Sequence, residues 1–169
     1  KDGEIIVKGP QLMKGYLDDE ETTNLVIKDG WLYTGDIGRF DENGYLYIVG
    51  RKNDRIVANG RTVWPTRVEE VLVNHPSVEH AIAFGVPDPL RCSTDIRAIV
   101  VPREGELQSK ELEKELIDLC SSELQEYMVP TRIMFRESVP LTVMGKVDRL
   151  KIIKEIDSMI NELMKGGEI

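Results

Sequence analysis

The sequence predicts an α+β fold, with a small three-stranded sheet, helices packed against it, a preceding β-hairpin, and terminal β-strands of a truncated N-terminal domain. Residues 1–50 contain short strand-like runs separated by turn residues, whereas helical periods appear only after Gly50. From residue 51 the predicted order is strand, helix, strand, strand, helix, strand, loop, helix, which suits a sheet covered by helices. We therefore expect two parts, residues 1–50 and residues 51–169.

Residues 1–50 are expected to be the edge of a larger preceding domain. Strand-like runs cover 4–7, 31–33, 36–40 and 45–49. The Asn43-Gly44 pair predicts a β-hairpin between the last two runs, because both residues tolerate positive φ. The charged run 18–23 predicts a solvated turn or one exposed helical turn. With few large apolar side chains, these pieces cannot offset the ordering entropy of a core of their own.

Three helices are expected after residue 51. The first begins at Pro65, which suits a first helical position, and ends at His75-Pro76. The second is amphipathic over 112–124, and the third is the terminal helix. The apolar stripes of the three helices are Val68, Val71 and Leu72; Leu112, Leu116, Leu119, Cys120 and Leu124; and Leu150, Ile153, Ile156, Ile160 and Leu163.

Three strands are expected to form the sheet, at 78–86, 96–101 and 132–135, and a loop containing Pro and Gly follows at 139–146. Most positions of the first strand are apolar, so we expect it to be covered on both faces. Its predicted faces are Val78, Ile82, Phe84 and Val86 on one side and Ala81 and Ala83 on the other.

Composition excludes several classes of protein. The chain is 41% hydrophobic and 31% charged, with a formal net charge of -8, so a nucleic-acid partner is disfavoured. No apolar run is long enough to span a bilayer, and the first residues do not resemble a signal peptide. The two cysteines and two histidines lack metal-site spacing, so no metal site is expected. Cys92 and Cys120 are interpreted as free buried thiols of a cytoplasmic protein.

Common nucleotide and nucleophile motifs are absent. Gly145-Lys146 would need Gly at 140 and Ser or Thr at 147 to form a phosphate-binding loop, but those positions hold Pro140 and Val147. Neither a dinucleotide-binding glycine pattern nor a Gly-x-Ser-x-Gly elbow is present. Taken alone, Lys146 would be interpreted as a surface lysine.

Three ordered segments change that interpretation. They are Tyr-Thr-Gly-Asp-Ile-Gly at 33–38, Gly-Arg-Lys-Asn-Asp-Arg-Ile at 50–56, and Pro-Leu-Thr-Val-Met-Gly-Lys-Val-Asp-Arg at 140–149. Together they resemble the adenylate-forming superfamily, which includes acyl-CoA synthetases, nonribosomal-peptide adenylation domains and luciferases. The resemblance extends from residue 3 to residue 155.

The resemblance implies a two-step ligase. A carboxylic acid and ATP give an acyl-adenylate and pyrophosphate, and a thiol then takes the acyl group. Residues 51–169 resemble the C-terminal lid domain, and residues 1–50 the last strands of the large AMP-binding domain. The family's phosphate loop, adenine pocket and acyl pocket would precede residue 1, so we expect a fragment that is inactive by itself.

Residue by residue, the resemblance implies a nucleotide site and a catalytic lysine. Asp36 matches the carboxylate that accepts hydrogen bonds from the two ribose hydroxyls, which is chemically sound because one carboxylate can accept from both. Arg51 matches the arginine on the ribose-phosphate side. Lys146 matches the catalytic lysine, whose compact charge would bridge the acyl carboxylate and the α-phosphate.

The resemblance also implies a moving lid. Asn53 stands at the hinge, where the family commonly has Asp or Lys, and Gly60 and Arg61 match the loop that lines the pantetheine tunnel of coenzyme A. Thr62 stands where many members carry Gln or Arg, and the stretch 91–95 also departs from the family. We expect residues 142–145 to be mobile, so that Lys146 can enter and leave the active site.

The leading hypothesis is therefore the lid of an acid:CoA ligase that uses ATP with Mg²⁺, whose ligands are not in this fragment, and coenzyme A. Its expected partners are its own N-terminal domain and a small carboxylic acid. One alternative is the lid of an adenylation domain that loads a carrier protein. The other is a non-catalytic interaction domain with the same fold, which the presence of Asp36, Arg51 and Lys146 argues against.

Overall fold

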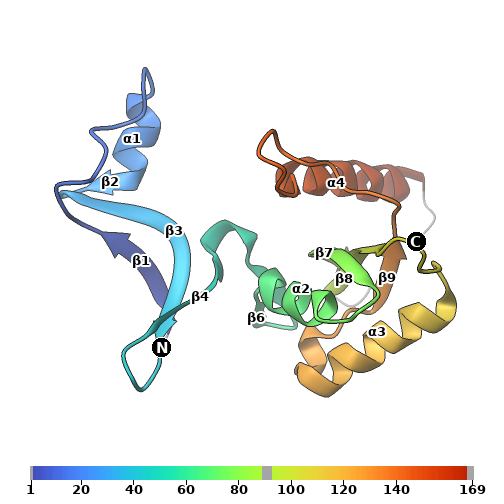
Figure 1. The fold of residues 1–169 in the computed structure, drawn as a ribbon. Helices are drawn as coiled ribbons and strands as arrows, with labels where there is room; N and C mark the ends of the chain where they lie inside the picture. Colours follow the sequence, from blue (N-terminus) through green and yellow to red (C-terminus); the bar gives the residue numbers. More distant parts are fainter. Residues whose placement is uncertain (1, 89–92, 167–169) are drawn as a thin grey trace. The chain divides into compact units, whose positions relative to one another are not determined.

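The computed structural model describes residues 2–88 and 93–166, and the chain divides into two compact units, the first ending at Arg55 and the second beginning at Ile56. The mixed α+β class is confirmed. Each unit is described by itself. Unit 1 is drawn in blue and teal in Figure 1, and unit 2 in green to red.

Unit 1 is built on one antiparallel sheet around a central strand. The strand β3 (Trp31–Phe40) pairs with β1 (Gly3–Val7), β2 (Ile27–Lys28) and β4 (Leu46–Arg51). The two separate strands predicted at 31–33 and 36–40 are thus one strand. A left-handed backbone at Gly35, with φ of 74°, lets β3 pass through an irregular segment without ending.

The helix α1 (Glu20–Val26) occupies part of the charged run that was predicted as a turn or a single helical turn. Its N-cap is Asp19, whose side chain accepts a hydrogen bond from the Thr22 N–H at 2.9 Å. That hydrogen bond lowers the pKa of Asp19. The helix buries no residue, so the expected exposure of this segment agrees with the structure.

The predicted hairpin between β3 and β4 is present, but its turn differs from the expected one. Only Gly44 has a positive φ, at 84°, while the Asp41 side chain accepts from the N–H groups of Asn43 and Tyr45 at 2.9 and 2.8 Å. The Asn-Gly loop with two positive φ values instead joins β5 (Ile56–Ala58) to β6 (Arg61–Val63) at the start of unit 2. There Asn59 has φ of 49° and Gly60 of 72°.

Unit 2 contains the predicted three-stranded sheet, in the order β7-β8-β9. The strand β7 (Val78–Asp88) pairs antiparallel with β8 (Ser93–Pro102), and β9 (Arg132–Phe135) pairs parallel with β8. A parallel neighbour needs a crossover connection, which α3 (Lys110–Glu123) and the short 3₁₀ helix η2 (Glu126–Met128) supply.

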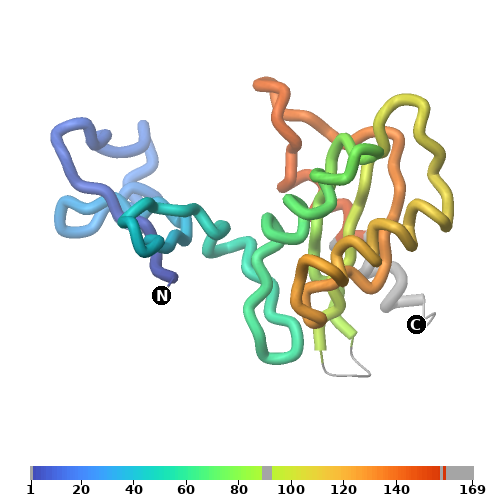
Figure 2. Tube along the Cα trace, turned by 60° about the horizontal axis from the view of Figure 1, so that its bottom comes forward, coloured from blue at the N-terminus to red at the C-terminus, as the bar shows by residue number. Residues whose placement is uncertain are grey.

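Helices cover both faces of this sheet (Figures 1 and 2). The helix α2 (Pro65–Val73) begins at Pro65 as predicted and packs with α3 on one face, whereas α4 (Arg149–Gly166) packs on the other. Fully burying a Leu or Ile side chain contributes roughly 1.5–3 kcal/mol. The fully buried large side chains include Leu72, Ile99, Leu116 and Ile152.

Two predicted apolar faces are wrong in detail. Val78 packs in the cluster of Ala83, not that of Ile82, because a register irregularity between Val78 and His80 reverses the alternation of the strand. In α4, Leu150 is 76% exposed and Ile152 is fully buried. Residues two apart lie on opposite sides of a helix, so only one of these two could face the sheet.

Cys120 is a free, buried thiol of α3, as predicted. Burial, followed by the nearby charge of Glu123, raises the pKa of this thiol to about 11. Cys92, for which the same prediction was made, lies outside the described residues, as do the side chains of Ile160 and Leu163.

Candidate functional site

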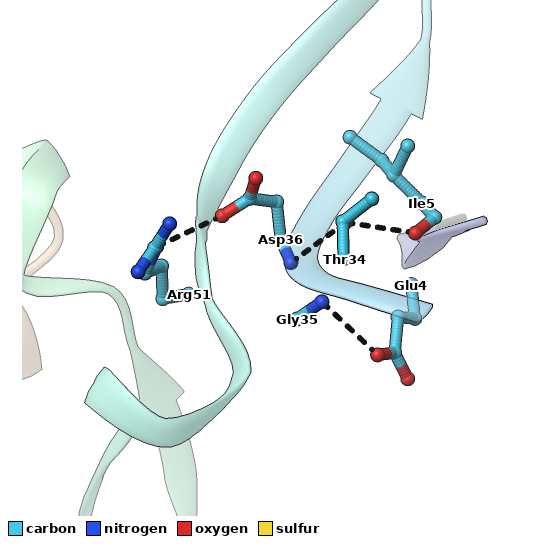
Figure 3. A network of polar contacts seen from close by, with 6 residues as sticks. All are labelled: Glu4, Ile5, Thr34, Gly35, Asp36 and Arg51. Carbon is cyan, nitrogen blue, oxygen red and sulfur yellow. Dashed lines mark hydrogen bonds and ion pairs between the residues drawn. The ribbon is translucent and has the colours of Figure 1, made fainter. Parts of the chain in front are cut away.

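Asp36 lies in a bulge of β3 (Figure 3). The register pairs Glu4↔Ile37 and Ile6↔Tyr33 leave residues 34–36 of β3 opposite the single residue Ile5 of β1. Thr34 Oγ1 donates to the Ile5 carbonyl at 2.8 Å and accepts from the Asp36 N–H at 3.1 Å. One hydroxyl therefore forms hydrogen bonds with two backbone groups that are not paired between the strands. These bonds stabilise the bulge, which changes the direction of the Asp36 side chain.

Arg51 lies directly opposite Asp36, at the end of β4. Its Nε donates to Asp36 Oδ1 at 3.0 Å, and the two side chains are 69% and 28% exposed, respectively. An exposed ion pair of this kind contributes only about 0–1 kcal/mol to stability. Its main consequence is geometric, because the cross-strand pair places a cation and a carboxylate together at an accessible point of the sheet.

Glu4 supports the same bulge from β1. Its Oε1 accepts from the Gly35 N–H at 3.2 Å and its Oε2 accepts from Lys52 Nζ at 2.9 Å. The hydrogen bond from Lys52 is the largest cause of a lowered pKa for this carboxyl. Thr34 belongs to the 33–38 segment that carries the resemblance, but sequence reasoning gave neither Thr34 nor Glu4 a role, because the hydrogen bonds from Thr34 to Ile5 and from Lys52 to Glu4 join residues far apart along the chain.

Lys146 closes a hydrogen-bonded turn within the loop that was predicted at 139–146. Leu141 and Val147 form an antiparallel bridge, the Thr142 N–H donates to the Lys146 carbonyl at 2.6 Å, and the Gly145 N–H donates to the Thr142 carbonyl at 2.8 Å. The Lys146 N–H donates to Thr142 Oγ1 at 3.2 Å. Gly145 adopts φ of 74°, and the turn leaves Lys146 exposed.

The remaining candidate residues lie in two other places. Asn53 is in the short 3₁₀ helix η1 (Lys52–Asp54), two positions before the end of unit 1. Gly60 forms the tip of the β5–β6 hairpin, and nothing lies within 4 Å of a Cβ added there. Arg61 follows it, and its guanidinium carbon lies 4.9 Å from the ring centroid of Tyr127, a cation–π distance.

The structure brings together Asp36 and Arg51, but it separates Lys146 from Gly60 and Arg61. Within unit 2, the bluish-green hairpin 56–63 and the orange turn 141–147 lie at opposite ends in both views (Figures 1 and 2). Thr62 lies in β6, opposite Val57. Of the departing stretch 91–95, Ser93, Thr94 and Asp95 begin β8, while Arg91 and Cys92 lie outside the described residues.

The chemistry of these residues suits the hydroxyl and phosphate groups of a nucleotide. Across residues 2–88 and 93–166, no three His, Cys, Asp or Glu side chains are grouped so that they could hold a metal ion. The Asp36 carboxylate can accept from paired hydroxyls, and Arg51 and Lys146 can face phosphate or carboxylate oxygens. In the part of the chain that the structure describes, no helix combines the length and apolar character needed to cross a bilayer.

Comparison with known proteins defines the class. Residues 67–146 match the family model of the AMP-binding enzyme C-terminal domain. The long-chain-fatty-acid–CoA ligase of Bacillus subtilis (strain 168) is 44% identical over 153 residues, which are 90% of this chain and 27% of that protein. The chain thus spans less than a third of the length of this relative.

Two solved structures have the same fold. The amide bond synthetase of Marinactinospora thermotolerans matches with a TM-score of 0.78 at 39% identity, covering 90% of this chain and 30% of that one. The o-succinylbenzoate CoA synthetase of Bacillus subtilis, in complex with its acyl-adenylate intermediate, matches with a TM-score of 0.79 at 32% identity, over 90% and 30%.

Fold and comparisons together define a C-terminal domain of the AMP-binding enzymes. Residues 67–146 thus belong to this family of domains, and the similarity of the chain to CoA ligases includes both units.

Proposed function

We propose that these 169 residues are the C-terminal part of an ATP-dependent acid:CoA ligase. Residues 1–50 would be the last strands of its AMP-binding domain and residues 51–169 its lid. The enzyme would convert a carboxylic acid and ATP into an acyl-adenylate and pyrophosphate and pass the acyl group to coenzyme A. The observation that carries the proposal is the 44% identity to a CoA ligase over 90% of the chain.

In this proposal, the unit 1 pair binds the nucleotide. Asp36 accepts hydrogen bonds from the ribose hydroxyls, and its ion pair with Arg51 keeps the carboxylate oriented while the guanidinium faces the phosphate side. We expect Mg²⁺ to be held by residues outside this chain. A cytoplasmic location remains part of the proposal, because Cys120 is a free thiol.

The two ends of unit 2 are assigned to the two half-reactions. Lys146 serves adenylation, whereas the hairpin with Gly60 and Arg61 serves thiol transfer. The separation of these segments supports this division, because one placement of the lid presents one end at a time (Figure 2). Asn53 is the proposed hinge, and its position just before the division between the units is consistent with that role.

The deciding experiment is Lys146→Ala in the full-length enzyme. We expect the rate of ATP–pyrophosphate exchange with the cognate acid to fall by about 10²–10³-fold, because one preorganised charge is lost. Thiol transfer from a supplied acyl-adenylate should keep its rate. Lys151→Ala, an exposed lysine at the start of α4, is the matched control. Equal slowing of both half-reactions would contradict the division of roles.

The hinge is tested by Asn53→Pro. Fixing φ near -65° restricts rotation of the backbone at this position, so we expect thiol transfer to slow while ATP–pyrophosphate exchange persists. Stopped-flow or quench-flow measurement of the two half-reactions separates these outcomes. A variant that transfers to coenzyme A at the normal rate would rule out a hinge at Asn53.

A second candidate acyl acceptor should be tested in the same assay. Similarity to an amide bond synthetase at 39% identity favours testing amines beside coenzyme A. A loaded carrier protein, the alternative taken from the sequence, is the third acceptor. Product formation with only one of the three acceptors identifies it. The absence of both ATP–pyrophosphate exchange and ATP-dependent product with every acid would favour a non-catalytic domain.

A further inference from the structure

Ala83 lies on an unpaired edge of the sheet. Because β7 is the end strand of the order β7-β8-β9, alternate residues of β7 direct their N–H and C=O groups away from β8. Ala83 is fully buried, so unpaired backbone groups there would be costly. The structure satisfies both groups with side chains and no further strand.

Glu69 and Arg149 supply these two hydrogen bonds. Glu69 of α2 accepts from the Ala83 N–H at 2.8 Å, and Arg149 Nη2 donates to the Ala83 carbonyl at 2.8 Å. Arg149 Nη1 also donates to Glu69 Oε1, and both side chains are largely buried. The guanidinium is therefore held in two directions, which fixes its plane as well as its position.

Arg149 is the point at which the Lys146 turn joins α4. The Asp148 N–H donates to the Pro140 carbonyl at 2.8 Å, and Asp148 Oδ1 accepts from the Lys151 N–H at 3.1 Å. Val147 packs beneath the turn in the α4 cluster. Lys146 itself is exposed, so its position depends on these anchors at the base of the turn.

We propose that Glu69 is a positioning residue for Lys146: by holding Arg149 on the edge of β7, it sets the place and direction in which the 141–147 turn presents the lysine. This inference rests on the proposed role of Lys146 in adenylation. A displacement of about 1 Å in a group that must meet a reacting atom can cost on the order of 10²-fold in rate.

The experiment is a double-mutant cycle in the full-length enzyme. Glu69→Ala is made with Lys146 present and with Lys146→Ala, and adenylation and thiol transfer are measured separately. We expect Glu69→Ala to lower kcat for adenylation by about 10–100-fold, with KM for ATP within about twofold and thiol transfer unchanged. In the Lys146→Ala background, Glu69→Ala should have no further effect, because the residue acts through the lysine.

Two conservative variants distinguish a loss of positioning from a loss of folding. Glu69→Gln keeps an oxygen that can accept from the Ala83 N–H, so it should retain more activity than Glu69→Ala. Arg149→Lys keeps the charge but loses the second donor direction, so it should reproduce the selective loss of adenylation. Glu70→Ala, the next residue of α2, is exposed, pairs with Arg67 at 3.4 Å, and should leave both half-reactions unchanged.

Additive losses in the two backgrounds, or equal slowing of both half-reactions, would overturn the inference, since Glu69 would then only stabilise the fold. A loss of adenylation in Lys146→Ala but not in Glu69→Ala would overturn the inference and leave the proposed function intact. Unchanged adenylation in Lys146→Ala would overturn the role of Lys146, and this inference with it.

Discussion

At the scale of single residues, the ionisation of Glu4 makes the stability of the candidate nucleotide site depend on pH. The hydrogen bond from Lys52, together with that from the Gly35 N–H, favours the ionised carboxylate and lowers its pKa in the folded state. A carboxyl with a lowered folded pKa stabilises the fold above its unfolded pKa. That contribution is lost as pH falls through the folded pKa.

Glu4→Gln should therefore lower the free energy of unfolding of unit 1 at pH 7. The difference from the parent protein should shrink as pH falls below the ordinary value of 4.5 and vanish below the folded pKa. Urea unfolding followed by Trp31 fluorescence in a Trp64→Phe background, in steps from pH 7 to pH 3, measures it. Glu42→Gln, at an exposed carboxylate in the turn between β3 and β4, is the control. A difference that stayed constant with pH would contradict the assigned cause.

At the scale of elements, two turns have the same hydrogen-bonding pattern. In 41–45 and in 142–146, the fourth residue is a glycine with φ of 84° or 74°, and its N–H donates to the carbonyl of the first residue. The side-chain oxygen of the first residue, Asp41 or Thr142, accepts from the N–H of the fifth. The same local chemistry thus serves a plain hairpin in one unit and presents Lys146 in the other.

Gly145→Ala and Gly44→Ala form a matched pair. Nothing lies within 4 Å of a Cβ added at either glycine, so each substitution costs only left-handed backbone strain of about 1–2 kcal/mol. Both variants should lose similar local stability by hydrogen exchange in their own turns. Only Gly145→Ala should also slow adenylation, because only that turn carries Lys146. A comparable loss of activity in Gly44→Ala would show a general effect on folding.

At the scale of the whole molecule, the two units differ in how they are held together. In the part of the chain that the structure describes, every buried apolar side chain of the core belongs to unit 2. Unit 1 instead exposes large apolar side chains, among them Leu17, Phe40, Tyr45 and Ile48. This agrees with the expectation that residues 1–50 cannot close a core of their own.

Backbone amides of β1 and β4 should accordingly exchange at least about 100-fold faster than those of β7 and β8 in the 169-residue chain, because local opening is easy where few contacts are buried. Hydrogen exchange followed by mass spectrometry measures the contrast. Uniform protection would mean that unit 1 has a core. A mass measurement in solution identifies the other source of protection, strand exchange between copies.

The sequence by itself determined the α+β class, the start of α2 at Pro65, the three strands of the unit 2 sheet and the ordered motifs that identify the superfamily. These features depend on residues that are close along the chain, where periodicity, proline and glycine have local effects. The same local rules predicted the hairpin at 43–44 correctly but not its turn conformation, because only Gly44 has a positive φ there, and the loop that uses both positive φ values is at 59–60.

Only the tertiary structure decided which residues support the candidate site. Glu4 meets Gly35 and Lys52 across 31 and 48 positions, and Glu69 meets Arg149 across 80. The bulge that re-aims Asp36 and the irregularity that moves Val78 to the other face arise from the pairing register of whole strands. Register and long-range partners are set by how distant segments pack, and no local pattern of residues encodes that choice.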